Sequence, residues 1–196
     1  IFWCILVAYA ITELSFCSTE DLTADETAHL TYGAKIVKGI SYKRSCTLDD
    51  SKMPVSALNA LPRAVEQALN PGLKKSDGGD SDTRLGRYIT FLFSLVSLYM
   101  VFKWSSEWYG EKAGLFSMGL TAFCPTFLAH SGLVTTDAYS VLVVLLVLYT
   151  FWKYLNTHSG KYFILFCICT GIAQITKQTF FYLYILIPLF LVIYYP

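Results

Sequence analysis

Six long apolar segments dominate the sequence and restrict what the chain can fold into. They cover approximately residues 1–16, 88–103, 114–130, 138–155, 162–176 and 179–195. The hydrocarbon core of a bilayer is about 30 Å thick, and a helix needs about 20 predominantly apolar residues to cross it. The stretch 141–152 is apolar nearly throughout rather than at alternate positions, which indicates helices and not the strands of a membrane barrel. We therefore expect an all-α membrane protein, a multi-pass helical bundle with about six spans.

The distribution of charge agrees with this expectation. Only 15% of the residues are charged, whereas a soluble domain carries about 25%. Most of the charged residues lie between the first two apolar segments, in residues 17–87. The net charge of +1 gives no indication of a nucleic-acid partner. Because the sequence begins and ends within apolar runs, we expect residues 1–196 to be the N-terminal transmembrane module of a longer protein.

Basic residues in the short connections predict the orientation in the membrane, because they favour the cytosolic side. The connections after the second and fourth segments each carry two lysines, whereas the connection 131–137 carries no lysine or arginine. Loop 17–87, connection 131–137 and the turn 176–178 are therefore predicted to be extracytosolic. The membrane would be a bacterial plasma membrane or that of the endoplasmic reticulum, and membrane lipids would surround the spans.

The long outer loop shows signs of its own structure. Thr23 and Glu26 have the spacing of a capping box, which predicts a helix from there towards Gly39. A second, amphipathic segment over 55–69 could lie on the membrane surface. The stretch 74–82 is polar and glycine-rich, so we expect it to be mobile. Two cysteines of the loop could pair in an oxidising compartment: Cys17 and Cys46.

Acidic and aromatic residues at the start of the first loop helix are candidates for chemistry. Asp25, His29 and Tyr32 are spaced i, i+4 and i+7, so they would lie on one helix face. A carboxylate at the membrane boundary could act as general base for a hydroxyl acceptor. The alternative is that the two acids favour the helix dipole and that Glu26 completes the cap. Glu26 and His29 also resemble half of a carboxylate-bridged metal site, but no second such helix exists, so metal binding stays open.

The other outer connections add a carboxylate and cations. Asp137 opens the fourth span after two threonines, where it could be ordinary helix-start chemistry or a functional group. His130 ends the third span, and Lys177 lies in the turn before the sixth. Lys177 could extend to lipid head groups or hold a lipid phosphate, and Arg87 could contact a phosphate in the same way. A phosphate-linked donor needs such cations for its leaving group and a base for its acceptor.

Several short motifs, in order, resemble those of the C-type glycosyltransferases. They are ADETAHLTYG at 24–33, MPVSAL at 53–58, Gly86-Arg87, WYGEKAG at 108–114, PTFLAH at 125–130 leading to Thr136-Asp137, and GIAQITK at 171–177. The order is similar to that of the protein O-mannosyltransferase and aminoarabinose-transferase superfamily, which takes sugars from polyprenyl phosphates. The polar insertion at 74–84 departs from this pattern.

The resemblance implies a role for each candidate residue. Asp25 would be the catalytic base, with Glu26 beside it, and the acceptor hydroxyl would attack the sugar with inversion. Lys177 and Arg87 would stabilise the departing lipid phosphate, Asp137 would orient the site, and the remaining candidates would contribute to substrate binding: His29, Tyr32 and His130. No cofactor is certain, although some relatives bind a divalent metal.

The implied function is membrane transfer of a sugar from a polyprenyl-phosphate donor to a protein, lipid or glycan acceptor. Two other classes of protein remain as alternatives. A transporter or flippase-like carrier would bind its substrate near the midplane through broken helices and polar residues, and within these spans only Gln174 is both polar and deep. A non-catalytic membrane scaffold would use the outer loop to bind a partner.

Overall fold

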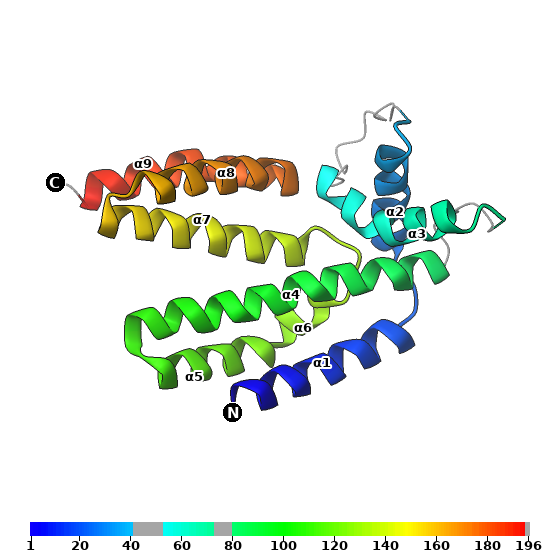
Figure 1. Ribbon diagram of the computed structural model, residues 1–196, viewed down its shortest axis with the longest axis horizontal. Helices are drawn as coiled ribbons and strands as arrows, with labels where there is room; N and C mark the ends of the chain where they lie inside the picture. Colours follow the sequence, from blue (N-terminus) through cyan, green and yellow to red (C-terminus); the bar gives the residue numbers. More distant parts are fainter. Residues whose placement is uncertain (41–52, 73–79, 195–196) are drawn as a thin grey trace.

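The computed structural model describes residues 1–40, 53–72 and 80–194, and these residues form helices without a β-strand. Figure 1 shows the chain from its N-terminus in blue to its C-terminus in red. In chain order the elements are α1 (Phe2–Thr19), α2 (Ala24–Val37), η1 (Pro54–Ser56), α3 (Ala57–Leu69), α4 (Asp80–Tyr109), α5 (Glu111–Ala122), α6 (Pro125–Ser131), α7 (Asp137–Thr157), α8 (Gly160–Thr176), η2 (Gln178–Tyr182) and α9 (Leu183–Tyr194).

The membrane helices confirm an all-α, multi-pass protein but do not confirm six spans. By length and composition α1, α4 and α7 can each cross a membrane, and α5 with α6 makes a fourth candidate if the bent pair is one span. The bend of 66° falls at a break before Pro125, where a proline drives the preceding residue out of helical conformation. The last two predicted spans form helices that are too short for the same test: 160–176 and 178–193.

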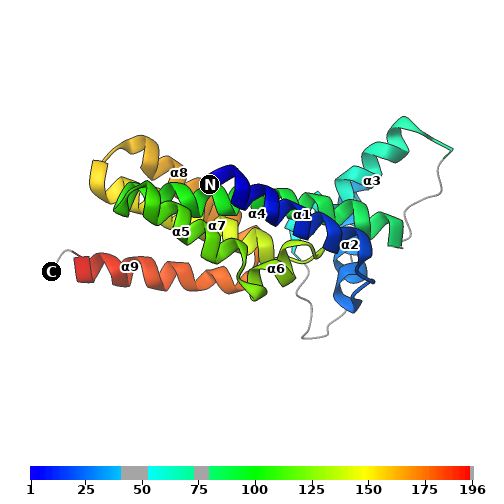
Figure 2. The same cartoon turned by 90° about the horizontal axis from the view of Figure 1, so that it is seen from below.

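The helices with the most apolar sequences run side by side, and α2 and α3 lie together at one end of them (Figures 1 and 2). α7 begins and α8 ends at this same end, close to α2 and α3 (Figure 1). We call this end of the molecule the outer end, and the end that holds the α4–α5 and α7–α8 turns the inner end. Most of the candidate residues named from the sequence therefore lie on segments that meet at the outer end.

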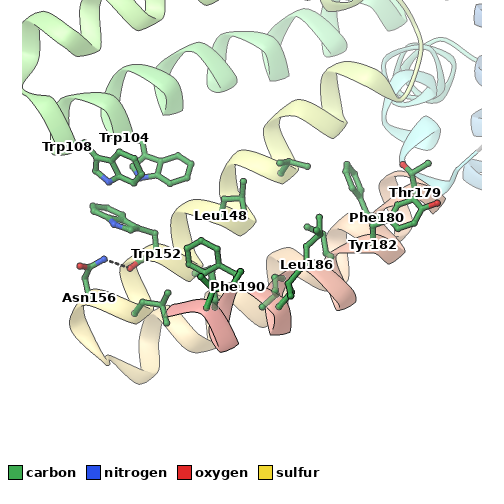
Figure 3. Close-up of a pocket in the computed structure, with 17 residues that line it drawn as sticks. Trp104, Trp108, Leu148, Trp152, Asn156, Thr179, Phe180, Tyr182, Leu186 and Phe190 are labelled. Carbon is green, nitrogen blue, oxygen red and sulfur yellow. Dashed lines mark hydrogen bonds between the residues drawn. The ribbon is translucent and has the colours of Figure 1, made fainter. Parts of the chain in front are cut away.

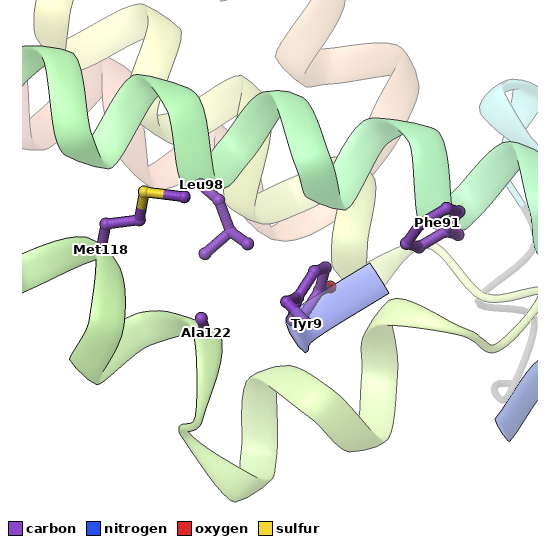
Figure 4. Close-up of a cluster of buried hydrophobic side chains, with 5 residues drawn as sticks. All are labelled: Tyr9, Phe91, Leu98, Met118 and Ala122. Carbon is purple, nitrogen blue, oxygen red and sulfur yellow. The ribbon is translucent and has the colours of Figure 1, made fainter. Parts of the chain in front are cut away.

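Two clusters of buried apolar side chains join the membrane helices. One connects α1, α4 and α5 (Figure 4) and consists of Tyr9, Phe91, Leu98, Met118 and Ala122. The other connects α7, α8 and α9 and consists of Val143, Val147, Ala173 and Leu183. Small residues allow close approach in a membrane, where lipid tails are as apolar as the helices themselves. Gly114 does this between α4 and α5, because a Cβ there would meet the Ser106 hydroxyl and the Phe102 carbonyl.

The part of the loop 17–87 that the structure describes follows the predicted pattern. α2 begins after Thr23 with the capping box, and its apolar stripe packs through Leu30 against Ala60 of α3 and Val134. The prediction that residues 74–82 are mobile is partly wrong, because residues 80–82 form the start of helix α4. Residues 74–79 lie outside the described residues. Cys46 also lies outside them, and Cys17 is buried near the Gly132 carbonyl.

The amphipathic character of α3 is confirmed, because its apolar stripe is open on the surface. Leu61, Val65 and Leu69 are 42%, 55% and 76% exposed, and they recur every four residues on one face of the helix. The opposite face carries Asn59 and Ala60, which are buried against the rest of the protein. Contact of the exposed stripe with the membrane stays a prediction.

Candidate functional site

A buried ion pair at the outer end joins α2 to α4. Arg87 Nε donates to Glu26 Oε1 at 2.8 Å and Arg87 Nη2 donates to Glu26 Oε2 at 2.7 Å. The Thr23 backbone N–H donates to Oε2 at 3.1 Å, and the Val134 backbone N–H donates to Oε1 at 3.0 Å. Both charged side chains are fully buried. Glu26 therefore fastens the first turn of α2 to α4 and to the connection between α6 and α7.

The surroundings of Glu26 keep it ionised. Burial by itself would raise the pKa of the Glu26 carboxyl, but the hydrogen bonds from Arg87, Val134 and Thr23 and the charge of Arg87 outweigh it. The pKa of Glu26 is consequently lowered from its ordinary value. A bidentate pair of this kind is stronger than a neutral hydrogen bond and has a defined geometry.

Arg87 makes further contacts in the same place. Its Nη1 donates to the Glu20 carbonyl and its Nη2 to the Asp21 carbonyl, both at 2.8 Å. The guanidinium thus binds the segment that joins α1 to α2 as well as Glu26. Arg87 is fully buried and these contacts hold the loop in place, while the phosphate contact suggested by the sequence stays a prediction.

Asp25 has a different environment from its neighbour Glu26. It lies in the first turn of α2 and is exposed. His29 is buried, with its Nδ1 at 3.2 Å from the Ser56 hydroxyl, and Tyr32 is half-buried. Within the described ranges, no group of three or more histidine, cysteine, aspartate and glutamate side chains could hold a metal ion.

A second, accessible charged cluster is formed by residues that are far apart in the sequence. Lys177 Nζ donates to Asp137 Oδ1 at 2.6 Å, and both side chains are 36% exposed. His130 Nδ1 lies 3.5 Å from Asp137 Oδ2. Asp137 opens α7, His130 lies near the end of α6, and Lys177 stands in extended conformation between α8 and η2. The structure therefore brings together three of the predicted site residues.

A buried polar network that the sequence did not reveal joins α3, α4 and α7. Asn59 of α3 donates through Nδ2 to the Gly86 carbonyl at 2.9 Å and to Thr90 Oγ1 at 2.7 Å. The Tyr139 hydroxyl donates to Asn59 Oδ1 at 2.9 Å. The residues are buried on three different helices, so no local sequence pattern could have identified the network.

An apolar groove of about 720 Å³ runs along α7 and α9 (Figure 3). At one end it is lined by Thr179 and Phe180, which closely follow Lys177. At the other end it is lined by the ring of Trp108 from the last turn of α4 and by Asn156 from α7. Most of the lining between these ends is aliphatic or aromatic. The groove can therefore hold a long apolar chain whose polar end lies near the accessible charged cluster.

One comparison with known proteins gives a match. The family described as dolichyl-phosphate-mannose-protein mannosyltransferase matches residues 79–195, which is more than half of the chain. No curated protein and no solved structure matches the chain. The matched region includes the buried arginine, the accessible charged cluster and the groove, whereas Asp25 and Glu26 precede it.

Proposed function

Since the chain belongs to the dolichyl-phosphate-mannose-protein mannosyltransferase family, we propose that its outer end forms part of the active site and that Asp25 is the general base. The family is one of membrane glycosyltransferases that take mannose from dolichyl phosphate. In this proposal the reaction takes place on the extracytosolic side and inverts the sugar carbon. The membrane is that of the endoplasmic reticulum or a bacterial plasma membrane.

The environment of Asp25 is the observation that carries the proposal. Asp25 is exposed, so its carboxylate can meet an acceptor hydroxyl from the aqueous side. Glu26, the next residue, is fixed by Arg87 of α4 and by the Val134 N–H, three residues before Asp137. An accessible base on a rigidly held turn has the properties that proton abstraction requires. Glu26 itself is fully buried and paired, which suits a positioning role.

Lys177 has the properties needed to bind the phosphate of the donor. A lysine ammonium has three N–H donors, and Asp137 accepts one of them at 2.6 Å. Two donors can still meet phosphate oxygens, and Asp137 keeps the ammonium at the start of the groove. His130, when protonated, would add a second positive charge beside Asp137. Charge that develops on the leaving phosphate would be stabilised electrostatically by these groups.

The groove suits the apolar tail of the same donor. Its length follows α9 away from Lys177, and its lining is largely aliphatic and aromatic, with side-chain polar atoms on Thr179, Asn156, Tyr182 and three tryptophans. A polyprenyl chain has no polar group along its length, so this lining matches it. With the phosphate at Lys177, the tail would lie between α7 and α9 (Figure 3).

The proposed step conserves atoms and charge. The acceptor oxygen loses its proton to Asp25 and forms a bond to the anomeric carbon of mannose. The bond from that carbon to the phosphate oxygen breaks, and its electron pair leaves with the lipid phosphate. Because the attack comes from the face opposite the leaving group, the configuration of the carbon is inverted.

Substitution of the proposed base tests the mechanism in the full-length protein. Asp25→Asn keeps the shape of the side chain but removes its basicity, so we expect mannose transfer to fall by about 10²–10⁴-fold. The donor KM should stay nearly unchanged, because the base does not hold the phosphate. Transfer is measured with dolichyl-phosphate-mannose in isolated membranes, and the anomeric configuration of the product is determined by NMR.

Asp21→Asn is the matched control, because Asp21 is also exposed and carries the same side chain in the segment before α2. Its contact with Arg87 is made by the backbone carbonyl, which the substitution retains. Transfer by Asp21→Asn should equal that of the unmodified protein. Undiminished transfer by a correctly inserted Asp25→Asn variant would remove Asp25 as the base, and a product with retained configuration would exclude the single-step inverting mechanism.

A further inference from the structure

A hydrogen bond between Asn59 and Tyr139 links the outer-loop helix α3 to the first turn of α7. Asn59 is 1% and Tyr139 is 1% exposed, so water cannot replace the bond between them. The amide orientation of Asn59 follows from its partners, because the Gly86 carbonyl can only accept and therefore faces Nδ2. Oδ1 is then the atom that accepts from the Tyr139 hydroxyl.

The close approach of α3 to α4 depends on a glycine. A Cβ on Gly86 would lie 3.1 Å from the Asn59 carbonyl oxygen and 3.1 Å from a Val134 methyl group. Without a side chain at this position the two helices come near enough for Asn59 to donate to the Gly86 carbonyl and to Thr90. Asn59 is therefore fixed to α4 by both of its amide hydrogens, which makes it a rigid acceptor for Tyr139.

Tyr139 in turn fixes the first turn of α7. Its ring packs edge-on against Phe93 of α4, with ring centroids 4.7 Å apart, and its hydroxyl binds Asn59. Asp137 lies two residues earlier in the same turn and holds Lys177. A shift of this turn would move the carboxylate that positions the ammonium.

We infer that Asn59 and Tyr139 are positioning residues for donor binding, acting through Asp137 and Lys177. This inference rests on the proposed role of Lys177 at the donor phosphate. Neither side chain contacts the reacting atoms in this assignment, since both are buried in the protein interior. Their loss should consequently change the donor KM while leaving the chemical step and the acceptor KM largely intact.

Tyr139→Phe in the full-length enzyme tests the inference, because it removes the hydroxyl and keeps the packing of the ring. We expect the donor KM to rise by about fivefold or more and kcat to stay within about twofold. Asn59→Ala should raise the donor KM in the same direction. If the two residues act as one unit, the double variant should have a donor KM no higher than that of the worse single variant.

Tyr149→Phe is the matched control. Tyr149 belongs to the same helix, and its hydroxyl also donates a single bond, to Glu107 Oε1 at 2.9 Å, but towards the inner end of the molecule. A purely structural effect would lower the thermal stability of both Tyr→Phe variants and leave the donor KM unchanged in both. That result, or an unchanged donor KM for Tyr139→Phe alone, would overturn the inference.

Lys177→Ala, measured in the same assay, separates this inference from the proposed function. We expect it to raise the donor KM. If Lys177→Ala raises the donor KM and Tyr139→Phe does not, the phosphate contact stands and the positioning role is wrong. If Lys177→Ala leaves the donor KM unchanged, the proposed phosphate contact is wrong, and the inference falls with it.

Discussion

Asp25 and Glu26 show how the surroundings of a residue decide its role. Both are carboxylates in the first turn of α2, yet one is exposed and the other is fully buried. The buried one meets a guanidinium and two backbone N–H groups, so its lone pairs are satisfied and its charge is compensated. The exposed one remains accessible to a substrate. The sequence could place both at a helix start but could not distinguish them.

The pair formed by Glu26 and Arg87 leads to a prediction about stability. Arg87→Ala leaves Glu26 buried without its counter-charge, and removal of one partner of a buried pair costs about 3–5 kcal/mol. We expect this loss as a lower midpoint of thermal unfolding for the full-length protein in detergent. Lys112→Ala removes an exposed lysine and should change stability by less than about 0.5 kcal/mol.

A double variant, Arg87→Ala with Glu26→Ala, provides the critical comparison. Once the carboxylate is removed as well, no uncompensated charge remains in the interior, so part of the lost stability should return. A double variant that is as unstable as the sum of the two single variants would show that the two residues do not act as a pair.

At the scale of helices, close approach at glycines holds the outer end together. Gly33 of α2 lies directly against η1, where an added Cβ would collide with the Ser56 carbonyl. The neighbouring contact of His29 with the Ser56 hydroxyl requires the same short separation. Because the colliding atoms belong to the backbone, a rotamer change cannot relieve the contact.

Gly33→Ala is therefore expected to destabilise the protein by about 1–3 kcal/mol, as overpacking does. Gly171→Ala in α8 is the matched control, since a Cβ there meets no atom within 4 Å. Alanine favours helix over glycine by up to about 1 kcal/mol, so the control should be neutral or slightly stabilising. Equal thermal midpoints for the two variants would contradict the close contact between α2 and η1.

At the scale of the whole molecule, the arrangement of the helices separates two ends. α7 has 21 residues and is therefore about 32 Å long, close to the thickness of a bilayer core. The start of α7 lies at the outer end with α2, α3 and the end of α8 (Figure 1), and its first residue, Asp137, binds Lys177 there. Its last residues lie at the inner end, where Lys153 binds Glu107 of α4 at 2.9 Å.

Labelling of single cysteines tests the orientation of these ends in the membrane. Glu20, Gln178 and His158 are exposed positions outside the α-helices, and each is replaced by cysteine in the full-length protein without its other cysteines. In sealed vesicles, a membrane-impermeant maleimide should reach Glu20→Cys and Gln178→Cys from the extracytosolic side only. It should reach His158→Cys from the cytosolic side only. Labelling of Gln178→Cys from the cytosolic side alone would separate Lys177 from Asp25 and exclude the proposed active site.

The sequence by itself determined the local elements of this protein. Apolar runs predicted the membrane helices, the capping box at Thr23 predicted the start of α2, and the spacing of apolar residues predicted the exposed stripe of α3. Each of these depends on residues within a few turns of one another, so the pattern is complete in the sequence. The motifs also indicated the enzyme family that the match over 79–195 shows.

The tertiary structure alone decided which polar groups meet. Glu26 and Arg87 are separated by 61 positions, Asp137 and Lys177 by 40, and Asn59 and Tyr139 by 80. The structure also shows the 66° bend at the break before Pro125 and the short helices that left six spans unconfirmed. The physical reason is that a distant pair forms only where helix packing brings the two segments together. That packing depends on side-chain volume, as at Gly33 and Gly86, which periodicity in the sequence does not record.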